Sequence, residues 1–191
     1  IGHALQESVA HTMSSEEWEW IHSIEERRSF LLGSEKQIPV IDYGAGKPDS
    51  DRTKEDMEKG EQSVVPIANI CKASKSALWA TVLFKLIREL EPSSCVELGT
   101  CVGISASYQA AALSINGKGH LITLEGSPEI ARIAEETLNG LNVSNATVVI
   151  GPFHKTLNGV LESARPVDLF FNDGHHDRDA VIQYFNEAIL Y

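Results

Sequence analysis

The spacing of apolar residues along the chain changes near residue 92. Upstream of this point, apolar residues recur every three to four positions, which is typical of helices. Ser14 and Glu17 have the spacing of a capping box and predict a helix that ends near Gly33. Residues 42–61 are polar and rich in glycine and charge, which predicts a surface loop. A strongly amphipathic helix is predicted to end at Pro92, with its apolar face formed by Leu78, Val82, Leu83, Leu86, Ile87 and Leu90.

Downstream of residue 92, short apolar runs alternate with helical stretches. The runs predict strands at residues 95–98, 121–124, 147–150 and 167–171, and each strand is followed by a predicted helix. We expect Ser127 and Asp177 to cap two of these helices. Strands that alternate with helices pair in parallel and carry helices on both faces. The sequence therefore predicts an α/β fold with a Rossmann-like, doubly wound and mostly parallel sheet over residues 92–191, preceded by a helical and loop segment over residues 1–91.

The predicted strand at residues 167–171 is apolar throughout, which is typical of a central strand and not of an exposed edge. Few residues follow it, so no further strand is predicted beside it. We therefore expect the core to be truncated at its C-terminus, or its edge to be covered by a partner.

Composition narrows the functional classes. The 191 residues are 42% hydrophobic and 23% charged, which suits one globular domain. The 16 basic and 27 acidic side chains give a net charge of −11, which disfavours general nucleic-acid binding. No apolar run approaches the ~20 residues that cross a bilayer, so no membrane partner is expected. The odd cysteine count without a CxxC pair argues against disulfides or a thiolate zinc site, and we expect a cytoplasmic protein.

Unusual residues follow the first two predicted strands, where ligands bind in doubly wound sheets. Gly99 and Gly103 flank a tight turn into a helix, which would let backbone approach a ligand. Their spacing fits neither the dinucleotide fingerprint nor the phosphate-loop motif. Glu125, after the second strand, could accept both hydroxyls of a ribose. A tight turn that needs small residues and a solvated surface charge remain the simpler alternatives.

The third and fourth predicted strands end in two further groups. Gly151, Pro152 and Phe153 could flank an adenine, although Phe153 fits the core equally well. The sequence from 172 to 177 reads NDGHHD, a polar cluster that has little structural purpose directly after an apolar strand and is therefore a candidate for function. The alternative is a helix cap with solvated histidines.

Four segments together, ELGTCVGIS, LITLEGSP, VVIGPF and DLFFNDGHHD, resemble class I S-adenosylmethionine-dependent methyltransferases of the small-molecule O-methyltransferase branch. The resemblance covers residues 93–177. It implies a methyl group transferred from S-adenosylmethionine to the hydroxyl of a small molecule. It also implies that Glu125 with Gly126 and Ser127 holds the ribose, and that residues 151–153 lie near the adenine. The methionine part of the cofactor would be lined by Glu97, Gly99, Thr100 and Gly103.

The resemblance also implies catalytic roles for Asp173 and His176. Asp173 would lie beside the sulfonium and the acceptor, and in catechol- and caffeoyl-type relatives an Asp here binds a divalent cation such as Mg²⁺. His176 stands where those relatives have a lysine that takes the acceptor proton, and an imidazole can act as such a base. The further metal ligands of those relatives follow a fifth strand that this chain does not reach.

Two other functional classes stay open. A binding or scaffold protein could keep the fold without the chemistry. A metal-dependent hydrolase could be built on Asp173, His175, His176 and Asp177, although adjacent residues in one loop rarely converge on one ion. The sequence lacks the [DN]-P-P-[YF] motif of amino-methylating DNA enzymes. A small-molecule acceptor is therefore expected, and a homodimer is left open.

Overall fold

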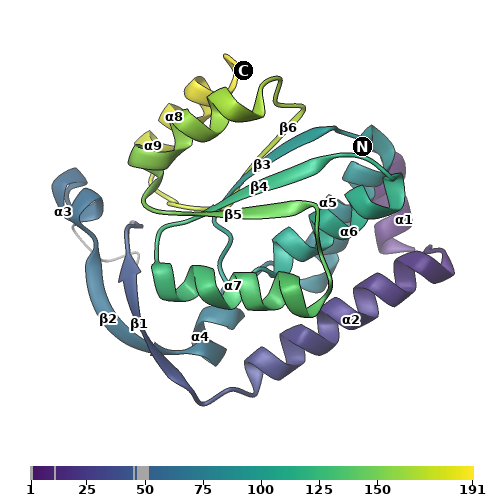
Figure 1. Cartoon of the computed structure of the whole chain (residues 1–191), viewed down its shortest axis with the longest axis horizontal. Helices are drawn as coiled ribbons and strands as arrows, with labels where there is room; N and C mark the ends of the chain where they lie inside the picture. Colours follow the sequence, from purple (N-terminus) through teal and green to yellow (C-terminus); the bar gives the residue numbers. More distant parts are fainter. Residues whose placement is uncertain (1, 11, 45, 47–51) are drawn as a thin grey trace.

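A parallel sheet of four strands lies at the centre of the computed structural model, which describes residues 2–10, 12–44, 46 and 52–191 (Figure 1). The strand order is β5-β4-β3-β6, and all three neighbouring pairs are parallel. The four predicted strands and their parallel pairing are thereby confirmed. The strands are β3 (Ser94–Leu98), β4 (His120–Glu125), β5 (Ala146–Ile150) and β6 (Leu169–Asn172).

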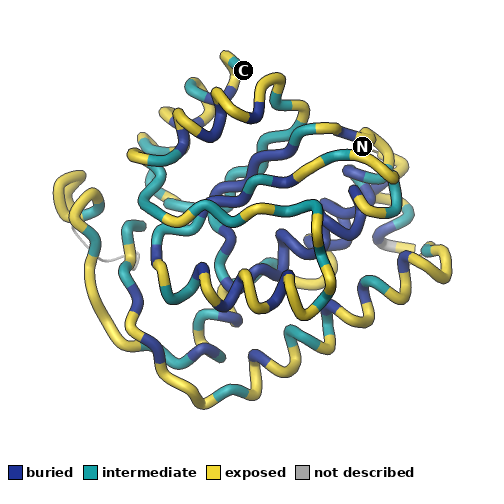
Figure 2. The backbone as a smooth tube through the Cα atoms, viewed as in Figure 1, coloured by how far each residue is buried: buried dark blue, intermediate teal, exposed yellow. Residues whose placement is uncertain are grey.

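Helices cover both faces of this sheet, as the sequence predicts. On one face α6 (Ile104–Asn116) and α7 (Pro128–Gly140) pack on β4 and β5, and α2 (Ser15–Leu32) and α5 (Ala77–Leu90) pack outside α6. On the other face α8 (Phe153–Ala164) packs on β3 and β4, and α9 (Arg178–Ala188) adds Tyr184 and Ala188 to the same core. Figure 2 shows the buried backbone concentrated in the inner strands and in α6. In the part of the chain that the structure describes, no helix is long and apolar enough to span a membrane.

The strand β6 has the apolar sequence of a central strand, but it lies at an edge of the sheet. Among the described residues it pairs only with β3, in agreement with the expectation that no further strand lies beside it. The helix α9 explains part of its apolar character, because Phe170 and Tyr184 belong to one core cluster.

A short helix corrects the predicted loop at residues 42–61, and two strands that the sequence did not predict flank this loop as a hairpin. The strands β1 (Gln37–Asp42) and β2 (Glu61–Pro66) pair antiparallel, and α3 (Lys54–Lys59) lies between them. A capping box of Thr53 and Asp56 starts α3, yet none of its residues is buried, so its sequence has no apolar periodicity to detect. Residues 45 and 47–51 of the predicted loop lie outside the described part. The chain then continues through α4 (Ile67–Lys72).

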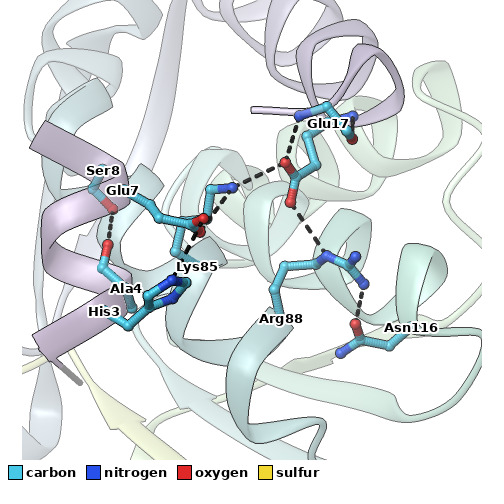
Figure 3. Close-up of polar contacts among 9 residues, drawn as sticks. His3, Ala4, Glu7, Ser8, Glu17, Lys85, Arg88 and Asn116 are labelled. Carbon is cyan, nitrogen blue, oxygen red and sulfur yellow. Dashed lines mark hydrogen bonds and ion pairs between the residues drawn. The ribbon is translucent and has the colours of Figure 1, made fainter. Parts of the chain in front are cut away.

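A buried ion cluster joins the N-terminal helices to α5 (Figure 3). The Lys85 ammonium, only 5% exposed, lies 2.9 Å from the Glu17 carboxylate and 3.3 Å from that of Glu7 on α1 (Gly2–Val9). Arg88 Nε lies 3.3 Å from the other Glu17 oxygen, and the Ser14 N–H donates to Glu17 at 2.8 Å. Burial alone would raise the pKa of Glu17, but the Ser14 N–H and the Lys85 ammonium bring the pKa below its usual value.

Replacing Lys85 tests whether this cluster holds the N-terminal helices in place. Lys85→Met leaves the Glu17 carboxylate buried with Arg88 as its remaining cation, so we expect the free energy of unfolding to fall by about 2–4 kcal/mol. Urea denaturation measures the change. The control is Lys118→Met, which removes an exposed pair with Glu91 and should change stability by less than about 1 kcal/mol. Equal stability of the two variants would contradict the structural role of the cluster.

Candidate functional site

The reversal of strand order around β3 opens a crevice at the carboxyl end of the sheet. The chain leaves β3 toward β4 on one side and reaches β6 on the other, so the loops after β3 and β6 separate at this point. A cavity of about 1050 Å³ lies here, and residues of all four post-strand loops line it. The hairpin supplies the opposite wall through Val40, Tyr43 and Arg52, and α3 adds Met57. Figure 1 shows the hairpin and α3 beside this end of the sheet.

Gly99 lets the loops after β3 and β6 meet. Its φ is +95°, and a Cβ there would lie 2.8 Å from the carbonyl oxygen of Asp173. Gly99 lines the cavity, as the ligand hypothesis requires. Thr100 and Gly103 do not line the cavity. The Thr100 hydroxyl bonds to that of Thr123 at 2.6 Å, and Gly103 gives α6 its close approach to Ala134.

Glu97 is buried in the core beneath α6 and is not among the residues that line the cavity. Its carboxylate is fully buried and accepts hydrogen bonds from Gln109 Nε2 at 2.7 Å and from Thr123 Oγ1 at 2.6 Å. Burial raises the pKa of Glu97 to about 7, although hydrogen bonds from neighbouring side chains act in the opposite direction. In this structure no atom of Glu97 is on the cavity wall, so the expected contact with the methionine part of a cofactor has no counterpart in the lining.

Glu125 reaches the cavity and is oriented by backbone. The Cys101 N–H donates to one carboxylate oxygen at 2.9 Å, and the Ser127 N–H donates to the other at 3.0 Å. Burial raises the pKa of Glu125 to about 7, against the lowering effect of these N–H groups. Each oxygen keeps a lone pair for a further donor, so the carboxylate can accept from two hydroxyl groups at once.

The two residues after Glu125 contact the hairpin. Gly126 lies under the Tyr43 ring, where a Cβ would come within 2.7 Å of a ring carbon. Ser127 precedes α7 as expected, but its hydroxyl makes no cap hydrogen bond and accepts instead from the Ile41 N–H at 3.2 Å. Ser127 is buried and does not line the cavity, so its contact in this structure is with the hairpin.

The loops after β5 and β6 form a second part of the wall. Pro152 and Phe153 line the cavity, whereas Gly151 does not. The Phe153 ring covers Gly174, where a Cβ would lie 2.5 Å from it, and meets the Tyr184 ring edge-on at 5.9 Å. The aromatic side of the cavity is thus built by α8, α9 and the loop between β6 and α9.

Of the two adjacent histidines, His175 contacts neighbouring side chains through both ring nitrogens, and His176 is exposed. His175 has a φ of +50°, and its ring nitrogens lie 3.0 Å from the Tyr184 hydroxyl and 3.1 Å from Met57 Sδ. Burial lowers the pKa of His175. Both histidines line the cavity, and Asp177 caps α9 as predicted, accepting from the Asp179 and Ala180 N–H groups.

Asp173 has a partner that the sequence did not indicate. The Lys75 ammonium, from the loop between α4 and α5, lies 2.6 Å from Asp173 Oδ1, and both residues line the cavity. This ammonium stands where a metal bound to Asp173 would need room. Within the described part of the chain, no three His, Cys, Asp or Glu side chains are grouped closely enough to hold a metal ion. The described residues by themselves therefore do not complete a divalent-cation site at Asp173, and the four residues considered for a hydrolase are not grouped as metal ligands.

The charge on the described cavity wall is predominantly negative. The lining includes three lysine or arginine side chains and six carboxylates, the latter from Asp42, Glu58, Glu125, Asp173, Asp177 and Asp179. Such a wall attracts cationic ligands and repels anionic ones.

The raised pKa of Glu97 predicts how stability depends on pH. A carboxyl whose pKa rises from 4.5 to about 7 on folding contributes most stability below pH 4.5 and loses it as the pH approaches 7. Glu97→Gln does not ionise, so its melting temperature relative to wild type should increase by about 5 °C between about pH 5 and pH 7.5. Calorimetry at several pH values measures this difference. An exposed control on α8, Glu162→Gln, should show no such trend, and a flat difference for Glu97→Gln would contradict the buried environment of this carboxyl.

Comparisons with known proteins agree with this geometry. A family model described as "Methyltransferase domain" matches residues 96–190. A Bacillus cereus O-methyltransferase, solved in complex with SAH, is 27% identical, with a TM-score of 0.57 over 64% of this chain and 55% of that one. The O-methyltransferase TomG from Streptomyces achromogenes, in complex with SAM, is 24% identical, with a TM-score of 0.55 over 62% of this chain and 52% of that one.

One further structure extends the match into the N-terminal segment. The SAH-bound Podospora anserina methyltransferase PaMTH1 is 17% identical, with a TM-score of 0.60 over 87% of this chain and 55% of that one. A search of curated protein sequences found no match. The chain spans little more than half the length of these three structures. The strand order, the crevice and the family match agree: residues 96–190 belong to the methyltransferase domain family and have the fold of the class I S-adenosylmethionine-dependent methyltransferases.

Proposed function

We propose that this chain transfers a methyl group from S-adenosylmethionine to a hydroxyl group of a small molecule. The observation that carries the proposal is Glu125, whose carboxylate is fixed by two backbone N–H groups at the wall of the crevice. In this position it can accept both ribose hydroxyls of an adenosyl group. The O-methyltransferases of known structure support the proposal through their shared fold.

The cavity suits this cofactor in size and charge. Its volume of about 1050 Å³ exceeds that of most single-ligand pockets, which leaves room for a cofactor and an acceptor together. S-adenosylmethionine carries a positive sulfonium, and the described wall is predominantly negative. Gly99 offers backbone without a side chain at the centre of the crevice, and Phe153 offers an apolar ring for the adenine.

The cofactor supplies a methyl group already activated on sulfur, so the protein's task is to position the acceptor. Holding two reactants in line can contribute up to about 7–11 kcal/mol. Asp173 lines the cavity and can accept a hydrogen bond from the acceptor hydroxyl. His176 is exposed in the same lining and can carry a proton between the site and solvent. No divalent cation is needed for these roles.

Glu125→Gln tests the cofactor site. The change replaces one acceptor oxygen by an NH₂ group that faces a backbone N–H, so we expect affinity for S-adenosylhomocysteine to fall about tenfold or more. Titration calorimetry measures the affinity, and a thermal scan of each protein shows that it is folded.

The matched control is Glu129→Gln, in the first turn of α7, whose carboxylate pairs with Arg132. It should bind like wild type. No binding by folded wild type would overturn the cofactor assignment. Binding without methyl transfer to any hydroxylated probe would favour a scaffold protein.

A further inference from the structure

Lys75 is the one lysine in the described cavity wall that contacts a proposed catalytic carboxylate. Its ammonium lies 2.6 Å from Asp173 Oδ1, and the two side chains are 37% and 14% exposed. Lys75 belongs to no sequence motif, and no step of the proposed function uses it.

The loop that carries Lys75 is fixed by a chain of polar contacts. Arg28 Nη1 donates to the Lys75 carbonyl oxygen at 2.8 Å. Glu25 holds the same guanidinium, with Arg28 Nε 2.9 Å and 3.0 Å from its two oxygens, and accepts from the Tyr108 hydroxyl at 2.7 Å. On the other side of Lys75, Ser74 Oγ lies 3.8 Å from Cys101 Sγ in the turn after β3. These contacts connect the backbone at Lys75 to α2 and the neighbouring Ser74 to the turn after β3.

Both side chains of the Lys75–Asp173 pair can still bind a further ligand, Lys75 through its remaining N–H groups and Asp173 through its second oxygen. An ammonium has three N–H donors, and the contact with Asp173 is to a single oxygen, Oδ1. Within the residues that the structure describes, no protein group bonds to Asp173 Oδ2. A hydroxyl group both donates and accepts, so it can bridge the two side chains, accepting from Lys75 and donating to Oδ2.

We propose that Lys75 and Asp173 form the binding site for the acceptor hydroxyl, and that the Lys75 ammonium takes the place of a divalent cation. This inference rests on the proposed methyltransferase function. The hydroxyl's O–H bond breaks, its proton goes to Asp173 Oδ2, and the oxygen keeps the electron pair while the ammonium stabilises its negative charge. That electron pair forms the new bond to the methyl carbon, and the electrons of the broken carbon–sulfur bond stay on sulfur.

Charge decides between an ammonium and a metal at this position. A divalent cation at Asp173 would have to bind next to the Lys75 ammonium, which lies 2.6 Å from Asp173 Oδ1. The Lys75 ammonium already neutralises Asp173 and repels a second cation. The acceptor reaction should therefore proceed without added metal.

The experiment compares wild type with Lys75→Met, Lys75→Arg and the nearby exposed control Lys72→Met, whose ammonium bonds to Asn69 outside the cavity. The probes are catechol, phenol and benzyl alcohol, with methyl transfer measured in the presence of EDTA and then of Mg²⁺. We expect EDTA to have no effect and Lys75→Met to lose about tenfold or more in kcat/KM. Lys75→Arg should recover part of the loss, and Lys72→Met should match wild type.

Two readouts besides activity separate acceptor binding from a merely structural role. Affinity of Lys75→Met for S-adenosylhomocysteine should stay within about threefold of wild type, because the lysine serves the acceptor and not the cofactor. Electron paramagnetic resonance of Mn²⁺ should detect no binding to wild type. Mn²⁺ binding that is lost in Asp173→Asn would overturn the proposal, as would full activity of Lys75→Met or activity that EDTA abolishes.

The proposed function can fail separately from this inference. If folded wild type does not bind S-adenosylhomocysteine, the methyltransferase proposal fails, and the Mn²⁺ experiment alone still decides whether Lys75 excludes a metal. If wild type binds S-adenosylhomocysteine and methylates a probe, the methyltransferase proposal stands, and full activity of Lys75→Met then overturns the acceptor site proposed for Lys75 and Asp173 alone.

Discussion

The close contact between the loops after β3 and β6 is the constraint on which the site depends. Gly99 lies against the backbone of Asp173 in a conformation with φ of +95°, where a side chain would collide with that backbone. The Asp173 N–H donates to the Leu98 carbonyl at 2.9 Å, and the Gly99 N–H donates to the Leu124 carbonyl at 3.0 Å. Three strands thus end in one hydrogen-bonded junction, which brings Gly99, Glu125 and Asp173 to one cavity although they lie far apart in sequence.

The N-terminal segment completes this cavity from outside the sheet. The hairpin contacts the loop after β4 through Tyr43 over Gly126 and through the Ile41 N–H on Ser127. The loop before α5 supplies Lys75 to Asp173. Neither contact belongs to the strand–helix repeat of the sheet. In the proposed function, the parallel sheet therefore provides the cofactor side, the hairpin contacts that side beside Glu125, and the loop before α5 provides Lys75 for the acceptor.

The sequence predicted the sheet well because strands β3 to β6 are short apolar runs between recognisable turns and caps. It missed the hairpin because β2 is mostly exposed and α3 buries no residue, so neither has the apolar periodicity that sequence analysis detects. Lys75 could not be found either, because its partner is distant in sequence and a single loop lysine carries no motif. For Glu97, the sequence motif indicated a cofactor contact but not the face of the strand on which the side chain lies. Side chains alternate along a strand, so Glu97 lies on the same face as Cys95 and enters the core beneath α6.

The central claim is that the crevice beside β3 holds an adenosyl group through Glu125. The most direct measurement is a crystal structure of the chain with S-adenosylhomocysteine. The account predicts both ribose hydroxyls within hydrogen-bond distance of the Glu125 carboxylate, with the ligand backbone passing Gly99. A ligand bound elsewhere on the protein, or in the crevice with its ribose away from Glu125, would contradict it.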